Sequence, residues 1–153
     1  MTTKRIILSI VTIAIVCMVH GLVNAAAPAE SSGFSMGKWA FTGKDDKGVS
    51  WTGTLMVEKL DTKRFDAGKY HSMCNLEMKS GNSTKGVETP CTWEPNKREV
   101  SFSTGDTASY TAILSPDGKS LTRGKWTDSE KDYRTRKVTI TRTGVWSATF
   151  VGR

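Results

Sequence analysis

The sequence predicts an all-β domain: an antiparallel up-and-down barrel of eight or nine strands that carries one disulfide. Short runs alternate between apolar and polar residues, turn-forming residues fill the gaps between runs, and no long stretch has the three-and-four spacing of an amphipathic helix. Consecutive strands joined by hairpin-length loops form a meander, and closing the meander removes its exposed edges. An open sandwich of two sheets is the alternative architecture.

The first element is expected to be a secretory signal peptide at residues 1–25. A basic start at Lys4 precedes an apolar run over residues 6–19, and small residues at 23–25 offer a cleavage site before Ala26. An uncleaved membrane anchor is the alternative, although the apolar run is shorter than the roughly 18–20 residues that a spanning helix needs. The protein is therefore expected to be secreted or periplasmic, with no stable membrane insertion after cleavage.

Two further segments follow the predicted cleavage site. Residues 26–35 begin with a run of mostly small residues and are expected to form a flexible N-terminal arm, and residues 36–153 are expected to form one β-barrel domain. The mature chain keeps 20 Lys and Arg against 15 Asp and Glu, a net charge of +5. Basic residues are scattered among acids, as in residues 44–47 and 130–132, which favours a solvated barrel surface over a nucleic-acid site.

Period-two alternation defines the predicted strands. The clearest is residues 49–58, where Val49, Trp51, Leu55 and Val57 alternate with mostly hydroxylated or charged residues. Reversals between strands are expected at Lys44–Gly48, Ser80–Ser83, Glu94–Lys97 and Ser115–Gly118. The predicted strands lie near residues 36–43, 49–58, 67–79, 86–94, 98–104, 107–115, 119–127, 133–142 and 145–150.

Cys74 and Cys91 are the two cysteines of the mature chain and are expected to form a disulfide in an oxidising compartment. A hairpin of strands 67–79 and 86–94, turning near Asn82, sets the two cysteines directly opposite each other on the apolar face. A metal site is the alternative, but two cysteines and a single mature histidine make a poor zinc site.

The five tryptophans all fall in predicted strands of the mature domain. They are expected either to pack the core or to form a stacking wall around a ligand, and one barrel can do both. The residues predicted to line a ligand site are Trp39, Trp51, Tyr70, Trp93, Tyr110 and Trp126.

A Gly37-Lys38-Trp39 motif opens the first predicted strand, and residues 117–126 end in a second Gly-Lys-Trp. These motifs resemble the calycin superfamily: the G-x-W that opens the lipocalin barrel and the later strands of avidins. The resemblance implies a small closed barrel, and it gives Arg142 the role of the family's arginine that packs across Trp39.

The chain is also similar to bacterial metalloprotease inhibitors, which are periplasmic barrels of lipocalin type with one disulfide and a G-x-W strand. Their free N-terminal segment enters the protease cleft. This resemblance implies that residues 26–35 act as an inhibitory arm and that Cys74 and Cys91 supply the bridge.

Catalytic motifs are missing from the sequence, and no cofactor or metal is expected. His71 is the only histidine of the mature chain, and neither a glycine-rich phosphate loop nor a paired-histidine metal motif is present. The expected function is non-enzymatic binding of a small apolar or aromatic ligand in the barrel or at its mouth. The alternative is an enzyme inhibitor or interaction module that binds a secreted protein through its arm and basic surface.

Overall fold

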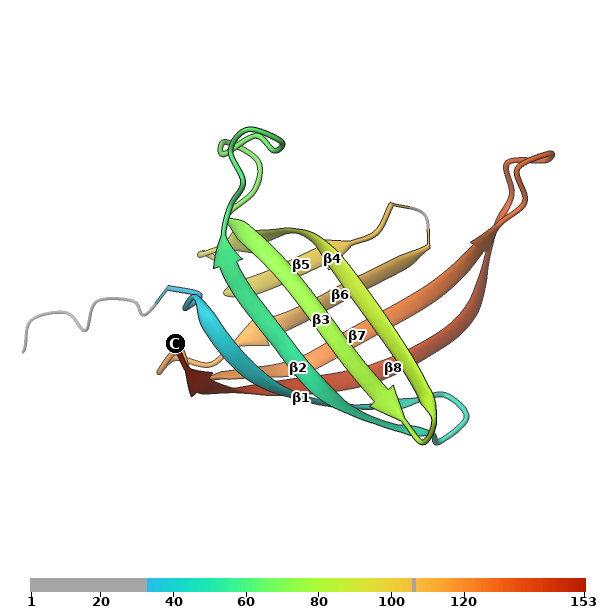
Figure 1. Cartoon of the computed structure of the whole chain (residues 1–153), viewed down its shortest axis with the longest axis horizontal. Coiled ribbons are helices and arrows are strands. Elements are labelled where there is room, and N and C mark those ends of the chain that lie inside the picture. The colour runs from blue at the N-terminus through green and yellow to red at the C-terminus, as the bar shows by residue number, and fades with distance from the viewer. Residues whose placement is uncertain (1–32, 106) are drawn as a thin grey trace, which may run out of the picture. The chain divides into compact units, whose positions relative to one another are not determined.

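A computed structural model of the chain describes residues 33–105 and 107–153. They form a closed barrel in which each strand pairs antiparallel with the next and β8 pairs back with β1 (Figure 1). The strands are β1 (Gly37–Asp45), β2 (Ser50–Lys59), β3 (Ser72–Ser80), β4 (Ser83–Glu94), β5 (Glu99–Ser103), β6 (Ala108–Leu114), β7 (Ser120–Lys131) and β8 (Val138–Gly152). The predicted up-and-down barrel is confirmed, with eight strands. In the described part of the chain, no helix is long and apolar enough to span a membrane.

The alternation of residues sorts side chains between the two faces of the barrel wall. In β1, Trp39 and Phe41 are buried while Lys38, Ala40 and Thr42 are exposed. The inward side chains fill the middle of the barrel. The largest completely buried ones are Trp39, Trp126, Tyr110, Phe41, Leu55, Leu76, Met78, Leu114 and Leu121.

Two predicted strand boundaries were wrong. The last two predicted strands are replaced by one continuous strand, β8. Residues 67–71, predicted to begin the third strand, belong instead to a loop over residues 60–71. Gly144 in β8 is a packing residue: a Cβ atom there would lie 2.1 Å from Nε1 of Trp126. In the 60–71 loop, the carbonyl of Asp66 accepts hydrogen bonds from the Lys69 and Tyr70 amides, which turns the chain before β3 begins.

The disulfide between Cys74 and Cys91 is confirmed, but the predicted register of its hairpin is wrong by two residues. Cys91 pairs with Ser72, and the loop between β3 and β4 is Gly81-Asn82. A slip of two residues leaves every side chain on the same face of the sheet, so both cysteines still point inward. Their Cα atoms lie 5.7 Å apart, and the bridge runs diagonally across the hairpin.

The two ends of the barrel differ. At one, which we call the plugged end, the buried ring of Phe34 packs against Trp39 and Trp93, with ring centroids 5.6 and 6.4 Å away. The indole Nε1 of Trp39 donates to the carbonyl of Ser35, 3.1 Å away. The described end of the predicted arm is therefore packed onto the barrel. The remainder of that arm and the predicted signal peptide lie outside the described residues.

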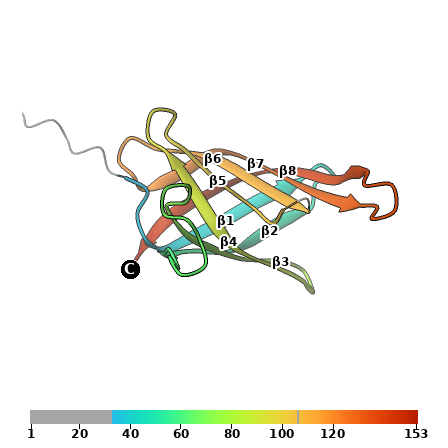
Figure 2. The ribbon, with the colours of Figure 1, turned by 90° about the horizontal axis from the view of Figure 1, so that it is seen from above.

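At the other end, which we call the open end, the strands are joined by the β1–β2, β3–β4, β5–β6 and β7–β8 turns. The β7–β8 hairpin extends well past its neighbours there (Figures 1 and 2). Because β5 is short, the open end is also where the barrel wall is least complete.

Candidate functional site

The β4–β5 ladder ends before it reaches the open end, which leaves a gap in the barrel wall. The ladder between β4 and β5 covers only Cys91–Glu94 of β4, so residues 83–90 have no ladder partner on that side. A hydrogen bond from Oγ1 of Thr89 to the carbonyl of Ser103, 2.6 Å long, is the last link between these two strands. An open pocket of about 390 Å³ lies between the free edge of β4, the β5–β6 loop and β7. The side chains of Lys85, Tyr110 and Asp128 line this pocket.

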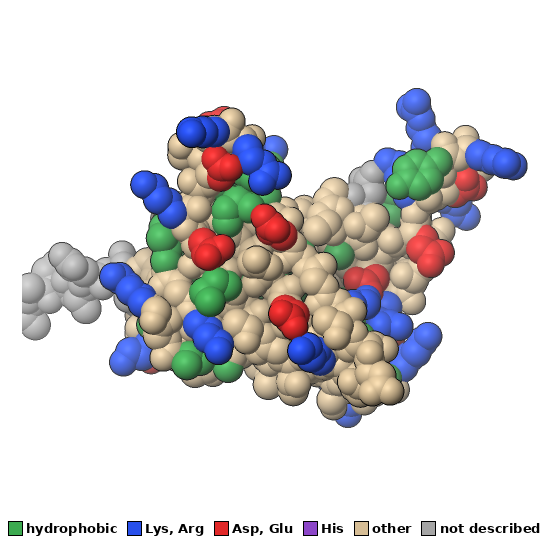
Figure 3. Space-filling model, viewed as in Figure 1, with side chains coloured by type: hydrophobic (Ala, Val, Ile, Leu, Met, Phe, Trp, Pro, Cys, Tyr) green, Lys and Arg blue, Asp and Glu red, His purple; other side chains and the backbone are tan. Residues whose placement is uncertain are grey.

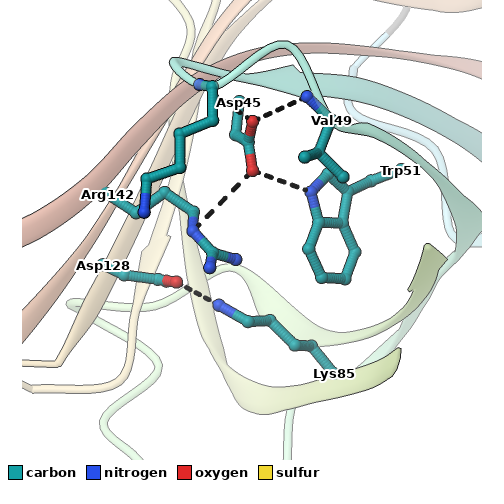
Figure 4. A network of polar contacts seen from close by, with 7 residues as sticks. Asp45, Val49, Trp51, Lys85, Asp128 and Arg142 are labelled. Carbon is teal, nitrogen blue, oxygen red and sulfur yellow. Dashed lines mark hydrogen bonds and ion pairs between the residues drawn. The ribbon is translucent and has the colours of Figure 1, made fainter. Parts of the chain in front are cut away.

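Lys85 crosses the open end from β4 to reach Asp128 on β7, with which it forms an ion pair (Figure 4). Its ammonium group lies 5.6 Å from the ring centroid of Trp51 and 5.5 Å from that of Trp126. An ammonium group over an indole face is attracted by the ring quadrupole. Lys85 therefore covers both aromatic faces and bridges the gap in the wall.

A second ion pair lies beside the first. The carboxylate of Asp45, with its side chain only 1% exposed, lies 3.7 Å from Nε of Arg142, whose guanidinium stands over the ring of Trp51 (Figure 4). Asp45 also accepts hydrogen bonds from the Val49 amide at 2.8 Å and from Nε1 of Trp51 at 3.5 Å. The role that the calycin resemblance gave to Arg142 is therefore wrong in detail, since Arg142 covers Trp51 and not Trp39.

These contacts determine the charge of Asp45. Burial raises the pKa of this carboxyl group, but hydrogen bonds from Val49, Trp51 and Lys47 and the charge of Arg142 outweigh burial and hold the pKa below its ordinary value. Asp45 is therefore an anion at neutral pH, and it fixes the positions of Trp51 and Arg142.

Two aromatic rings form the floor of the open end. The rings of Tyr110 and Trp126 are nearly parallel, with centroids 6.3 Å apart and an interplanar angle of 13°. Burial, together with the charge of Asp128, raises the pKa of Tyr110 well above its usual range, so the phenol stays neutral. The indole Nε1 of Trp126 is buried and has no hydrogen-bond partner among the described residues.

The six predicted ligand-site residues do not form one wall. Trp51, Tyr110 and Trp126 meet at the open end, whereas Trp39 and Trp93 contact Phe34 at the plugged end. Tyr70 lies outside the barrel on the 60–71 loop, where it packs edge-on against Phe65.

Four charged residues at the open end were not predicted as site residues: Asp45, Lys85, Asp128 and Arg142. The sequence does carry a signal for them. Asp45 lies an even number of residues after Trp39 and Phe41 on β1, and Asp128 lies two residues after Trp126 on β7. Because side chains alternate between the faces of a strand, both aspartates occupy inward positions. A charged residue at an apolar position near the end of a strand indicates an ion pair at the mouth of a barrel.

Comparison with known proteins adds no family. No known family model matches the chain, and no curated protein matches it.

Within residues 33–105 and 107–153, no group of three or more His, Cys, Asp or Glu side chains is placed to hold a metal ion. The arrangement at the open end, with aromatic faces under two ion pairs, is suited to binding and orienting a small molecule.

The open end provides a pH prediction. A carboxyl group whose pKa is lowered by folding stabilises the fold above its unfolded pKa of about 4, and this contribution is lost as the pH falls from there through the folded pKa. Between about pH 5 and pH 2, the free energy of unfolding should therefore fall more steeply for the wild type than for Asp45→Asn. Urea unfolding across this range measures both slopes. Asp46→Asn, at an exposed position, is the matched control, and parallel curves for wild type and Asp45→Asn would contradict the role given to Asp45.

Proposed function

We propose that the protein is an exported, non-catalytic binding protein of calycin type that holds a small aromatic or apolar molecule at the open end of its barrel. The observation that carries this proposal is the gathering of Trp51, Trp126 and Tyr110 beneath the Lys85–Asp128 ion pair, at a gap in the wall. The disulfide is consistent with an oxidising compartment.

Core packing favours a ligand at the mouth over one in the middle of the barrel. Leu55, Leu76 and Leu121 are completely buried and occupy the interior between the two ends. A ligand in the middle would have to displace such side chains, and interiors packed at protein density do not accommodate this cheaply. At the open end Trp51 and Trp126 are also buried, but the side chains over their rings, Lys85 and Arg142, are 33% and 30% exposed.

The polar groups at the open end suggest how a ligand is oriented. An aromatic or apolar body can stack on Trp51 once the Lys85 side chain moves aside, because long cationic side chains exchange readily between an aromatic face and water. The freed ammonium and the guanidinium of Arg142 are then available to an acceptor group of the ligand. A bound molecule with a planar ring and one polar or anionic group satisfies both parts of the site.

Titration of intrinsic tryptophan fluorescence tests this proposal. We expect 8-anilinonaphthalene-1-sulfonate, or an aromatic carboxylate from a panel, to quench the emission saturably. The Kd should rise at least about tenfold in Lys85→Gln, since a charge-assisted contact contributes roughly 1.5–3 kcal/mol, and it should also rise in Trp51→Phe. Trp93→Phe, at the plugged end, is the matched control and should leave the Kd unchanged. Absence of saturable quenching across the panel, or an equal loss in Trp93→Phe, would end the proposal.

Inhibition through the N-terminal arm is the second candidate, and the anchoring of Phe34 favours it. Phe34 is buried at the plugged end, and Gly33 beside it lies at the end opposite the ligand site. Deleting residues 26–32 keeps Phe34 in place. That deletion should abolish inhibition of a secreted protease while leaving the fluorescence titration unchanged.

A further inference from the structure

Exposed aliphatic side chains recur along the outer face of β8, with Thr143, Ser147 and Thr149 interspersed among them. Alternation turns Trp146 and Ala148 inward and leaves Val145 and Val151 outside, each 61% exposed. The register of the β7–β8 pair shifts between Asp128 and Ser129, where Thr141 of β8 is skipped in the ladder, and beyond this bulge Ile140 and Val138 are 62% and 46% exposed. Solvent-facing strand positions normally carry polar residues, so four aliphatic side chains along one strand are unusual.

Basic side chains flank this strip on both sides. Lys38 and Lys44 occupy outward positions of β1, and Arg123 and Lys125 are exposed on β7. The carboxylates of these strands occupy the alternating positions that face inward. Asp45 and Asp128 form the ion pairs at the open end, and Glu130 is two residues after Asp128 and so on the same face of β7. Asp46, in the turn after β1, borders the face.

The strip and its flanks enclose shallow grooves. Two adjoining depressions, of about 620 and 420 Å³, share Lys44, Lys125 and Val145 in their lining. The outer face of β1, β8 and β7, which we call the basic face, thus presents apolar contact area directly between rows of cations.

The tip of the β7–β8 hairpin extends this pattern away from the barrel. Tyr133 is 84% exposed, and Arg134, Arg136 and Lys137 stand next to it. A hydrophobic side chain surrounded by Lys and Arg is visible at the end of this hairpin (Figure 3). Asp132 accepts hydrogen bonds from the Arg134 amide and from Oγ1 of Thr135, so its carboxylate is engaged within the turn.

We propose that the basic face and the hairpin tip dock the protein peripherally onto an anionic lipid bilayer. The cations match a negatively charged surface, and the aliphatic side chains and Tyr133 match the boundary between headgroups and acyl chains, where aromatic and apolar groups bury area. A second copy of this chain is disfavoured because two such faces repel each other. A nucleic acid is disfavoured because Tyr133 is the one strongly exposed aromatic side chain among the described residues, so this surface has no row of aromatic faces on which successive bases could stack. This inference does not depend on the ligand site at the open end.

Flotation of the mature protein, residues 26–153, with phosphatidylcholine vesicles that contain or lack phosphatidylglycerol tests the inference. We expect binding only to the anionic vesicles, with an affinity that falls as salt rises. Each lysine near the surface contributes about fivefold, so Lys44→Gln with Lys125→Gln should weaken binding about 25-fold. Lys97→Gln, which removes an exposed lysine at the plugged end, is the matched control and should bind as wild type.

A second pair of variants separates apolar contact from charge. Ile140→Thr with Val145→Thr keeps every cation and should weaken binding several-fold at all salt concentrations, with far-UV circular dichroism unchanged. Equal binding to neutral and anionic vesicles would overturn the inference, and so would equal losses in Lys97→Gln and in the basic-face variants. Binding to polyglutamate without binding to anionic vesicles would also overturn it and would point to an acidic protein partner.

Discussion

Replacing Trp39 with alanine is expected to lower the free energy of unfolding by about 3–5 kcal/mol, the usual cost of deleting a fully buried aromatic side chain. Trp39 has no exposed surface and joins the barrel core to the plug. Its ring lies 5.6 Å from that of Phe34 and 5.2 Å from that of Phe150, and its Nε1 donates to the carbonyl of Ser35. The substitution leaves a cavity and a carbonyl without its donor, and both effects destabilise the fold.

Urea unfolding followed by far-UV circular dichroism measures this loss. Trp93→Ala is the matched control, because Trp93 also contacts Phe34 but is only partly buried, so its loss should be clearly smaller. Trp39→Phe retains ring packing, so its loss of unfolding free energy should lie between those of Trp39→Ala and Trp93→Ala. A loss below about 1 kcal/mol in Trp39→Ala would contradict the packing of Phe34 and Trp39 at the plugged end.

The fold was predictable because one local signal, alternation, determines which face each residue occupies. Trp39, Trp51, Trp126 and Trp146 all lie inside the barrel, as their positions in alternating runs indicate. The same parity kept the cysteine prediction correct despite the wrong register, since a slip of two residues does not exchange faces. The register itself depends on the two-residue loop Gly81-Asn82. The sequence has four consecutive turn-forming residues there, 80–83, so it does not fix the position of the turn, and the predicted register was wrong by two residues.

Strand ends were less predictable because glycine has more than one role. The gap predicted between strands 133–142 and 145–150 contains Gly144, yet this glycine lies within β8, where only a residue without a side chain leaves room for Trp126. The loop before β3 escaped prediction for a related reason: Tyr70 alternates with its neighbours as a strand residue would, but the turn at Asp66 directs it outside the barrel.

The candidate site was predicted only in part. Alternation predicts which face of the barrel wall a side chain occupies, but not which end of the barrel it lies at. Trp39 and Trp51 are both inward residues, but their strands run in opposite directions and place them at opposite ends. The ion pair of Lys85 and Asp128 joins residues 43 positions apart, and no local pattern contains that pairing. The basic face is hidden for the same reason, since lysines that look scattered along the chain meet only when β1 and β7 flank β8.

Removing the disulfide by replacing Cys74 and Cys91 together with alanine is expected to lower the free energy of unfolding by about 3 kcal/mol, the value for a closed loop of about this length. The two cysteines are 17 residues apart and completely buried. The bridge acts mainly by restricting the unfolded chain, and β3 and β4 stay paired through their ladder without it. The double variant should therefore keep the far-UV spectrum of the wild type while unfolding at lower urea.

Reduction of the wild type separates the cross-link from the packing of the cysteine side chains. Wild type in reductant should lose about as much stability as the double alanine variant, because both open the same loop, whereas reductant should leave the double variant unchanged. If the double variant loses far more than the reduced wild type, the difference belongs to the cavity left by two buried sulfur atoms. If neither loses stability, the loop between Cys74 and Cys91 is already restricted in the unfolded chain, and the bridge does not contribute to stability through chain entropy.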